Sequence, residues 1–249
     1  MAVRIERAGP VATVILDWPE QRNALDPANG DELQEALRQT AADEAICGIV
    51  LTGEGAFCAG GNLKGAQERA AMSPEERRAM ITASFQGIIR TLLDLPVPTV
   101  AAIDGPAVGM GFDIALACDS RLVGEGGWCR QGWGRLGLLS STGGILSLSR
   151  LSPGVLWQLL DGQTKLDGPT LERLGLGEAV SEGTARARAQ QRVATLSEIG
   201  RPALQGYVEL DRAARREQMD MHLEAVLDTQ TRLLYRPGFN DRAAGALNS

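Results

Sequence analysis

The chain has 249 residues, which is enough for one large α/β domain or two small ones. Its 44% hydrophobic and 22% charged residues are ordinary for a globular protein, and a formal net charge of −6 argues against a nucleic-acid-binding surface. A single histidine, His222, excludes a histidine-rich metal site, and four cysteines without a CxxC pair indicate reduced thiols in a cytoplasmic protein. We expect no signal peptide, no transmembrane segment and no membrane partner.

Strands and helices alternate along most of the chain. Strands are predicted at residues 2–7, 11–17, 46–52, 99–103, 121–123 and 178–180. Helices are predicted at 26–42, over most of 62–95 with a break at Ser73-Pro74, and at 110–118, 142–151, 153–161, 168–174 and much of 183–247. Residues 124–137 look irregular. Such alternation favours an α/β fold with parallel strands joined by crossovers, followed by a helical C-terminal part.

Two segments share one design, in which a buried strand leads through a glycine-containing loop to the start of a helix. They are residues 49–65 and residues 100–119. Ligands of open α/β sheets sit outside the carboxyl ends of the strands, where helix N-termini present unpaired N–H groups. Two such groups aimed at one point would form an oxyanion hole, although many loops of this kind only make turns. A phosphate loop and a dinucleotide-binding loop are both disfavoured, because GxxxxGK[ST] and GxGxxG are absent.

These loops also carry a family resemblance. Residues 22–25 (RNAL), 56–64 (AFCAGGNLK) and 101–111 (AAIDGPAVGMG) resemble, in order, three segments of the enoyl-CoA hydratase/isomerase (crotonase) family. Residues 117–119 (ACD) and 174–180 (LGLGEAV) are similar to two later segments of the family. The match runs over about residues 3–181 and departs from the family pattern at Asn62, where an aspartate is usual.

The resemblance implies a crotonase-like spiral of ββα units over residues 1–182, with a helical region at 183–249 that makes trimer contacts. It implies an acyl-CoA substrate, no cofactor beyond the coenzyme A of that substrate, and a homotrimer or a hexamer built as a dimer of trimers. It places the two oxyanion N–H groups at Gly61 and Met110. It makes Ala24, Ala59 and Asn62 candidates for binding coenzyme A.

This chain departs from the family pattern at the positions of the acid–base groups that hydratases use. The resemblance implies two glutamates, and the first position corresponds to Asp113, three residues after Met110 and therefore on the same helix face. Asp113 is either a catalytic acid–base group with a shorter reach or a first-turn carboxylate that complements the helix dipole. The second position falls at Trp133, which exchanges no proton but can wall the acyl pocket.

Other polar residues near this region have ordinary structural readings. Glu125, the one nearby alternative carboxylate, reads as a solvated loop residue. Arg130 and Arg135 could pair with Asp113, contact a carboxylated acyl group or lie exposed, which is the default. Residues 140–142 (SST) read as a helix cap, and no metal site is predicted.

The sequence therefore predicts an enzyme of enoyl-CoA hydratase/isomerase type that stabilises an enolate in an oxyanion hole, with Asp113 as its possible acid–base group. Two alternatives stay open. One is a non-catalytic acyl-CoA-binding member. The other is a different enolate reaction, such as C–C hydrolysis or decarboxylation.

Overall fold

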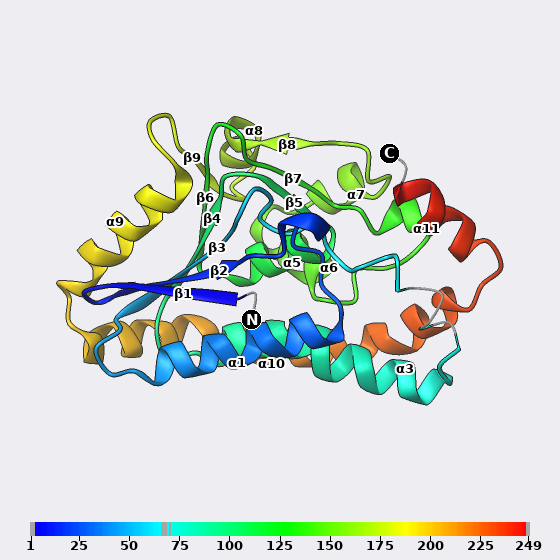
Figure 1. The fold of residues 1–249 in the computed structure, drawn as a ribbon, viewed down its shortest axis with the longest axis horizontal. Helices are drawn as coiled ribbons and strands as arrows, with labels where there is room; N and C mark the ends of the chain where they lie inside the picture. The colour runs from blue at the N-terminus through cyan, green and yellow to red at the C-terminus, as the bar shows by residue number, and fades with distance from the viewer. Residues whose placement is uncertain (1–2, 66–68, 70, 248–249) are drawn as a thin grey trace.

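Six strands form the main sheet, in the order β1-β2-β3-β4-β6-β9 (Figure 1). The computed structural model describes residues 3–65, 69 and 71–247. The predicted strands at residues 2–7 and 11–17 are confirmed and form an antiparallel hairpin, with Val3 opposite Leu16, and all other neighbouring strands of this sheet run parallel. The strands are β1 (Val3–Ala8), β2 (Val11–Leu16), β3 (Gly48–Gly53), β4 (Thr99–Ile103), β6 (Ser120–Val123) and β9 (Glu178–Ala179). Because β3 and β4 are parallel neighbours, the loops that follow them leave the same edge of the sheet.

Helices cover both faces of the sheet, which explains why its strands read as uninterrupted apolar runs. Ile49 and Leu51 of β3 pack on one face against Leu37 of α1, in the larger core cluster. Val50, which points to the other face, packs with Val193 of α9 in a second cluster. The helices before the C-terminal part are α1 (Pro27–Ala42), α3 (Pro74–Met80), α4 (Gly87–Asp94), α5 (Met110–Ala117), α6 (Gly144–Leu151), α7 (Val155–Leu159) and α8 (Gly168–Arg173).

The region between residues 62 and 95 is helical only in its second part. Asn62 belongs to no helix or strand, and residues 63–65 form a bend and turns, so the predicted helix is wrong there. Residues 66–68 and 70 of that prediction lie outside the described residues. The predicted break at Ser73-Pro74 is confirmed and carries a capping box, since Ser73 Oγ accepts from the Glu76 N–H and Glu76 accepts from the Ser73 N–H. A π-helical segment, η2 (Ile81–Gln86), joins α3 to α4.

A second, three-stranded sheet was missed by the sequence prediction. It has the order β5-β7-β8 and comprises β5 (Pro106–Val108), β7 (Trp128–Arg130) and β8 (Leu166–Asp167). The prediction that all of residues 124–137 are irregular is therefore wrong at β7. Strands of two or three residues carry too little alternation to be recognised, and here β7 is held by its pairing with β5 and β8.

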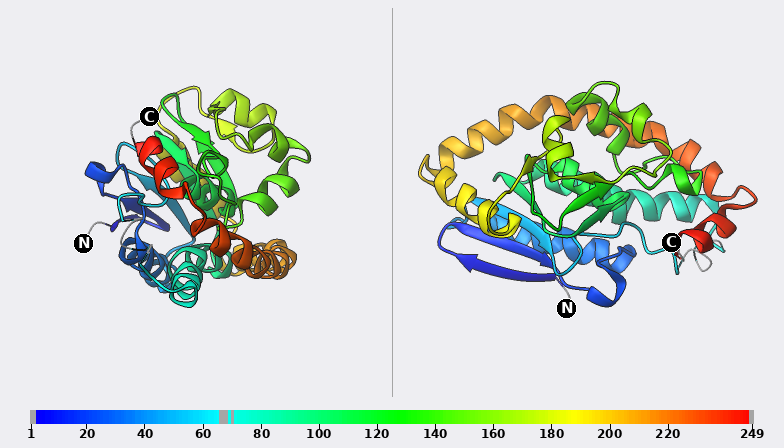
Figure 2. Two further views of the ribbon diagram at one scale, coloured as in Figure 1. Left: turned by 90° about the vertical axis from the view of Figure 1, so that its right-hand side faces the viewer. Right: turned by 90° about the horizontal axis from the view of Figure 1, so that it is seen from above.

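The C-terminal part consists of α9 (Ala185–Ser197), α10 (Arg201–Leu234) and α11 (Phe239–Leu247). α10 is a 34-residue helix that runs along the back of the molecule, and α11 turns back at one end and packs against the 3-10 turn η3 (Gly134–Leu136) (Figures 1 and 2). Arg212 fixes α10 to the sheet edge by donating from Nε to Asp119 Oδ1 at 2.9 Å and from Nη1 to the Leu95 carbonyl oxygen at 2.6 Å. α9 shares its apolar core with the sheet, although it belongs to the predicted C-terminal region.

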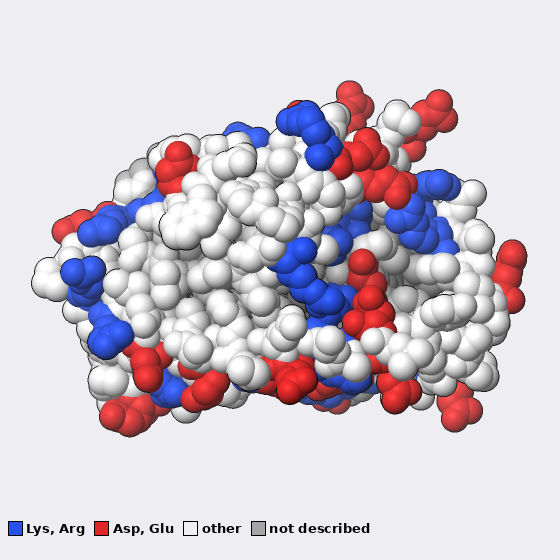
Figure 3. Space-filling view, turned by 180° about the vertical axis from the view of Figure 1, so that it is seen from behind, with Lys and Arg blue, Asp and Glu red and all other residues white. Residues whose placement is uncertain are grey.

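The surface carries charges of both signs. Lysine and arginine side chains are interspersed with aspartate and glutamate over the back of the molecule, beside a wide uncharged expanse (Figure 3). No helix within the described part of the chain is long and apolar enough to cross a membrane.

Candidate active site

The two predicted glycine loops meet beside the carboxyl ends of β3 and β4. Cys58 of the first loop forms a parallel bridge with Ala107 of the second. The Cys58 N–H donates to the Pro106 carbonyl at 3.0 Å, and the Val108 N–H donates to the Cys58 carbonyl at 2.9 Å. These bonds hold the backbone after Cys58 against the backbone that enters α5.

Glycines permit this close approach. Gly60 has a φ of +95° and Gly109 a φ of +55°, conformations that L side chains rarely adopt. A Cβ on Gly111 would lie 2.2 Å from the Cys58 carbonyl oxygen, far inside van der Waals contact. The first turn of α5 therefore packs directly on the first loop.

The Gly61 and Met110 N–H groups lie at the centre of this junction. Neither donates a hydrogen bond to any residue that the structure describes, whereas the flanking Gly60 and Asn62 N–H groups are both bonded. Gly61 and Met110 both line a cavity of about 460 Å³. The two predicted donors are thus unpaired and adjoin one cavity.

Residues 22–25 fasten the first loop in place. Asn23 is fully buried, and its amide donates to the Ala56 carbonyl at 2.6 Å and accepts from the Trp18 N–H at 2.7 Å. Leu25 bridges Gly61 through the bonds Leu25 N–H to Gly60 O and Asn62 N–H to Leu25 O, each 2.7 Å. This pairing uses the bonds on either side of Gly61 and leaves the Gly61 N–H facing the other way.

All four residues predicted to bind substrate line the same cavity: Ala24, Ala59, Asn62 and Trp133. Asn62 also stabilises its own loop, since its Oδ1 accepts from the Lys64 N–H at 3.0 Å and its amide donates to Gln21 Oε1 at 3.1 Å. Trp133 lies against the second loop, with its Nε1 3.9 Å from the position that a Cβ on Gly109 would occupy.

Asp113 lies behind Trp133 and is not among the described residues that line the cavity. Its carboxylate is 1% exposed and accepts four hydrogen bonds. The donors are Trp133 Nε1 at 3.0 Å, Ser140 Oγ at 2.7 Å, Thr142 Oγ1 at 2.6 Å and Gln131 Nε2 at 3.2 Å. Burial raises the pKa of Asp113 above its ordinary range, and these hydrogen bonds oppose the rise. Asp113 therefore holds Trp133 and the loop before α6 together.

The other polar residues considered in the sequence, Ser140, Glu125 and His222, lie largely as predicted. Ser140 Oγ accepts from the Gly144 N–H at 2.8 Å, so it satisfies one donor at the start of α6, while the N-cap position itself is Gly143. Glu125 is exposed in its loop. His222 lies on α10 and is absent from the described lining of the cavity.

The sequence analysis missed the cavity wall that faces the glycine loops. It is built by α3 and η2 on one side and by the α10–α11 corner on the other. Its lining residues are mostly apolar: Met80, Ile81, Phe85, Leu138, Leu234 and Phe239. One buried charge, Arg77, lies among them, and Arg130 lines the cavity from β7. The sequence offered one sign of this wall: Arg77 and Ile81 are four residues apart, which places them on the same helix face.

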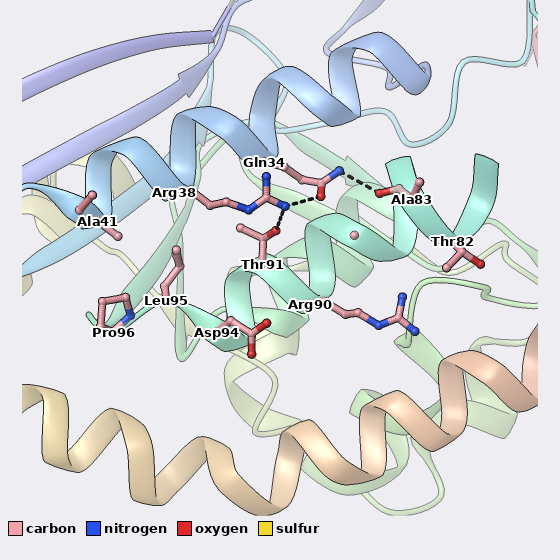
Figure 4. A pocket seen from close by; sticks show the side chains of 12 residues that line it. Gln34, Arg38, Ala41, Thr82, Ala83, Arg90, Thr91, Asp94, Leu95 and Pro96 are labelled. Carbon is pink, nitrogen blue, oxygen red and sulfur yellow. Dashed lines mark hydrogen bonds between the residues drawn. The ribbon is translucent and has the colours of Figure 1, made fainter. Parts of the chain in front are cut away.

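A larger cavity of about 690 Å³ lies elsewhere, between α1 and α4 (Figure 4). Its polar side chains bond to one another, as where Arg38 Nη2 donates to Gln34 Oε1 at 2.9 Å and to Thr91 Oγ1 at 3.0 Å. None of the predicted site residues lines it. We therefore place the candidate site at the glycine loops.

A model of the family described as "Enoyl-CoA hydratase/isomerase" matches residues 6–237. The chain belongs to this family. That finding confirms the resemblance inferred from the sequence and the enzyme class of enoyl-CoA hydratase/isomerase type.

Individual family members agree with this assignment. The chain is 29% identical over 249 residues to the mouse "Enoyl-CoA hydratase domain-containing protein 2, mitochondrial", covering 94% of this chain and 83% of that protein. It is 30% identical over 186 residues to the carnitinyl-CoA dehydratase of Proteus mirabilis, covering 74% of this chain and 69% of that protein. The solved structure of an enoyl-CoA hydratase from Bacillus halodurans superposes with a TM-score of 0.90 at 24% identity, covering 98% of this chain and all of that one. The family's crotonase fold, with its mixed α/β core and C-terminal helices, is thereby confirmed.

Proposed function

We propose that the protein binds an acyl-CoA thioester in the 460 Å³ cavity and stabilises the enolate of its acyl group. The thioester oxygen would accept hydrogen bonds from the Gly61 and Met110 N–H groups. The observation that carries this proposal is that both donors are unpaired within the described part of the chain and adjoin one cavity. Donors fixed in place before the reaction stabilise developing negative charge without reorganising.

The coenzyme A portion would lie along the first loop, beside Ala24, Ala59 and Asn62, which line the cavity. Trp133 would wall the acyl group, as its position beside Gly109 suggests. This reaction needs no metal and no redox cofactor, because the charge of the enolate is carried by backbone dipoles.

The proton transfers at the acyl group require an acid–base side chain, and Asp113 is the candidate. Asp113 could act as the acid–base group only if its contact with Trp133 opened, because the indole N–H donates to the carboxylate and the carboxylate is 1% exposed. Isomerisation would place the smaller demand on such a group, since one carboxylate can carry a proton between two carbons. We therefore propose chemistry of enoyl-CoA hydratase/isomerase type, with Asp113 reached by movement of Trp133.

Deuterium exchange tests this proposal. The protein is incubated with crotonyl-CoA or a 3-enoyl-CoA in D₂O, and product formation and deuterium at the α-carbon are followed. Replacing Met110 with proline removes its N–H at the first helical position, where proline is well tolerated, and the rate is expected to fall by on the order of 100- to 1,000-fold. Met110→Ala is the control, because it removes the side chain and keeps the N–H. Equal rates in the two variants would contradict the role of this donor.

A second candidate function is acyl-CoA binding without turnover. It is favoured by one observation: Glu20, which is exposed, is the one carboxylate among the described residues that line the cavity. In that case titration calorimetry would detect binding of crotonyl-CoA, and no exchange or product would form over hours. A third outcome, release of carbon dioxide or of a cleaved acyl fragment from a suitable thioester, would indicate another enolate reaction.

We also propose that the chain assembles as a trimer, or as a hexamer of two trimers, through its C-terminal helices. Support comes from the exposed face of α10, where Tyr207, Leu210 and Met221 are 68%, 80% and 69% exposed. Apolar side chains gathered on one helix commonly mark a subunit contact. Light scattering would give the mass of the assembly. A cytoplasmic location stays a prediction, since some relatives are named as mitochondrial.

A further inference from the structure

Arg77 is a buried cation in the wall of the proposed acyl site. It is only 2% exposed and lies on α3, on the same helix face as Ile81, which follows it by one turn. Both residues line the cavity, and Phe85, two turns further along, lines it too. The guanidinium therefore stands among apolar residues instead of reaching solvent, as arginine side chains usually do.

No residue of the described chain neutralises this charge. Arg77 Nη1 is buried and has no hydrogen-bond partner there, and no carboxylate forms an ion pair with the side chain. Its one close contact is the Tyr235 ring, whose centre lies 4.8 Å from Cζ. Burial lowers the pKa of Arg77 below its ordinary value, as expected where desolvation is not offset by an anion. Its sequence neighbour Arg78 differs, because Arg78 pairs with Glu224 and Asp228 on α10.

Arg77 enters the cavity beside the end of α10, because its guanidinium lies over the ring of Tyr235, which directly follows the lining residue Leu234. Leu138 and Phe239 form a small apolar cluster with Trp133 and Leu234 packed against it, and all four line the cavity. Trp133 is also the side chain beside the second glycine loop. An acyl chain that leaves the oxyanion donors past Trp133 would therefore run along this apolar wall, in which Arg77 is the buried charge.

We propose that Arg77 binds a carboxylate at the distal end of the acyl group, so that the preferred substrates are acyl-CoA esters of dicarboxylic acids. This inference rests on the proposed function of the same cavity. A planar guanidinium binds a carboxylate through two parallel hydrogen bonds, and such pairs are strongest where water is excluded. The carboxylate supplies the partner that Arg77 lacks, and the rest of the chain occupies the apolar lining.

The phosphates of coenzyme A are the other source of an anionic partner, and the test must separate the two. Calorimetry compares three matched pairs: succinyl- with butyryl-CoA, glutaryl- with valeryl-CoA, and adipyl- with hexanoyl-CoA. The members of each pair have the same number of acyl carbons and the same coenzyme A. We expect the dicarboxylic member of at least one pair to bind about 10- to 100-fold more tightly, the range of a charge-assisted hydrogen-bonded pair.

Variants then assign the preference to Arg77. Arg77→Met, unbranched and uncharged, should abolish the preference by weakening the binding of the dicarboxylic ester. Arg77→Lys should restore part of the preference, because the positive charge returns without the paired donors. Arg78→Met is the matched control on the adjacent, exposed position and should leave the preference intact. Thermal melting of each variant confirms that it is folded.

The outcomes separate this inference from the proposed function. Equal binding of both members in all three pairs by the wild-type protein would overturn the inference and leave acyl-CoA binding in place. An equal loss of affinity for both members in Arg77→Met would overturn it too, and would assign Arg77 to the coenzyme A phosphates. Failure of every ester to bind would overturn the proposed function itself.

Discussion

Two buried arginines of this protein have opposite surroundings. Arg212, where α10 meets the sheet, is fully buried and donates to Asp119 and to the carbonyls of Leu95 and Val97. Arg77, in the cavity wall, is 2% exposed, and no described residue accepts a hydrogen bond from its buried Nη1. Removing a charge from water is costly unless a partner compensates for it. The first arginine is compensated by the fold, so it is structural, whereas the second is left to a ligand.

The carboxylates of the same two regions, Asp119 and Asp113, differ in a parallel way. Although burial opposes it, Arg212 holds the pKa of Asp119 below its ordinary value. Burial raises the pKa of Asp113, whose partners are hydroxyl, amide and indole groups without charge. The junction of α10 with the sheet is therefore an ion-pair site, and the region behind Trp133 is a site of neutral hydrogen bonds.

The largest expected effect tests the junction. Arg212→Met would leave Arg215, at 3.3 Å, as the one described ion-pair partner of Asp119, and the Leu95 and Val97 carbonyls would each lose a donor. Breaking a buried pair by removing one partner costs about 3–5 kcal/mol of unfolding free energy. Urea denaturation measures the loss. Arg216→Met on the same helix is the control, since its contact with Asp94 is 3.9 Å long and exposed, and a similar loss there would remove the distinction.

A smaller effect tests the two carboxylates against each other. Because the pKa of Asp113 is raised on folding, the native state holds its proton above the ordinary pKa, and the stability due to this group falls as pH rises. Each unit by which the pKa of Asp113 is raised between pH 5 and pH 8 should cost wild type on the order of 1 kcal/mol of unfolding free energy relative to Asp113→Asn over that range. Asp119→Asn is the counterpart. The lowered pKa of Asp119 gives a contribution that is complete above its ordinary pKa and is lost as pH falls below about 4, so this comparison, followed in acid, should have the opposite slope.

An opposite result for Asp113 would be informative. If wild type gained stability relative to Asp113→Asn as pH rose, the four hydrogen-bond donors would outweigh burial and keep the group ionised. The region behind Trp133 would then resemble the junction, in which the charged form is the stable one.

The backbone part of the site could be predicted from the sequence, whereas the side-chain part could not. The pattern of buried strand, glycine loop and helix start predicted two loops with unpaired N–H groups, and the family resemblance assigned these groups to Gly61 and Met110. The burial of Asp113 depends on Ser140 and Thr142, almost thirty residues away, and on Trp133, so its separation from the cavity is a tertiary fact. Nothing in the sequence distinguishes Arg77 from the other arginines, because its burial depends on distant residues such as Tyr235 at the end of α10. The short strand β7 was missed for the same reason, since its pairing with β5 and β8 holds it.

The smallest expected effect is the change in unfolding free energy when Arg77 is replaced, and it tests the comparison between the two arginines most sharply. Without ligand, Arg77→Met removes an uncompensated buried charge and replaces it with a shorter apolar side chain. The stacking on Tyr235 that it loses is worth about 0.5–1 kcal/mol, and the desolvation it relieves is at least as large, so the unfolding free energy should stay equal or rise. Urea denaturation of the free protein, run beside Arg212→Met, measures this. A loss of several kcal/mol would mean that Arg77 is compensated by the fold after all and is as structural as Arg212.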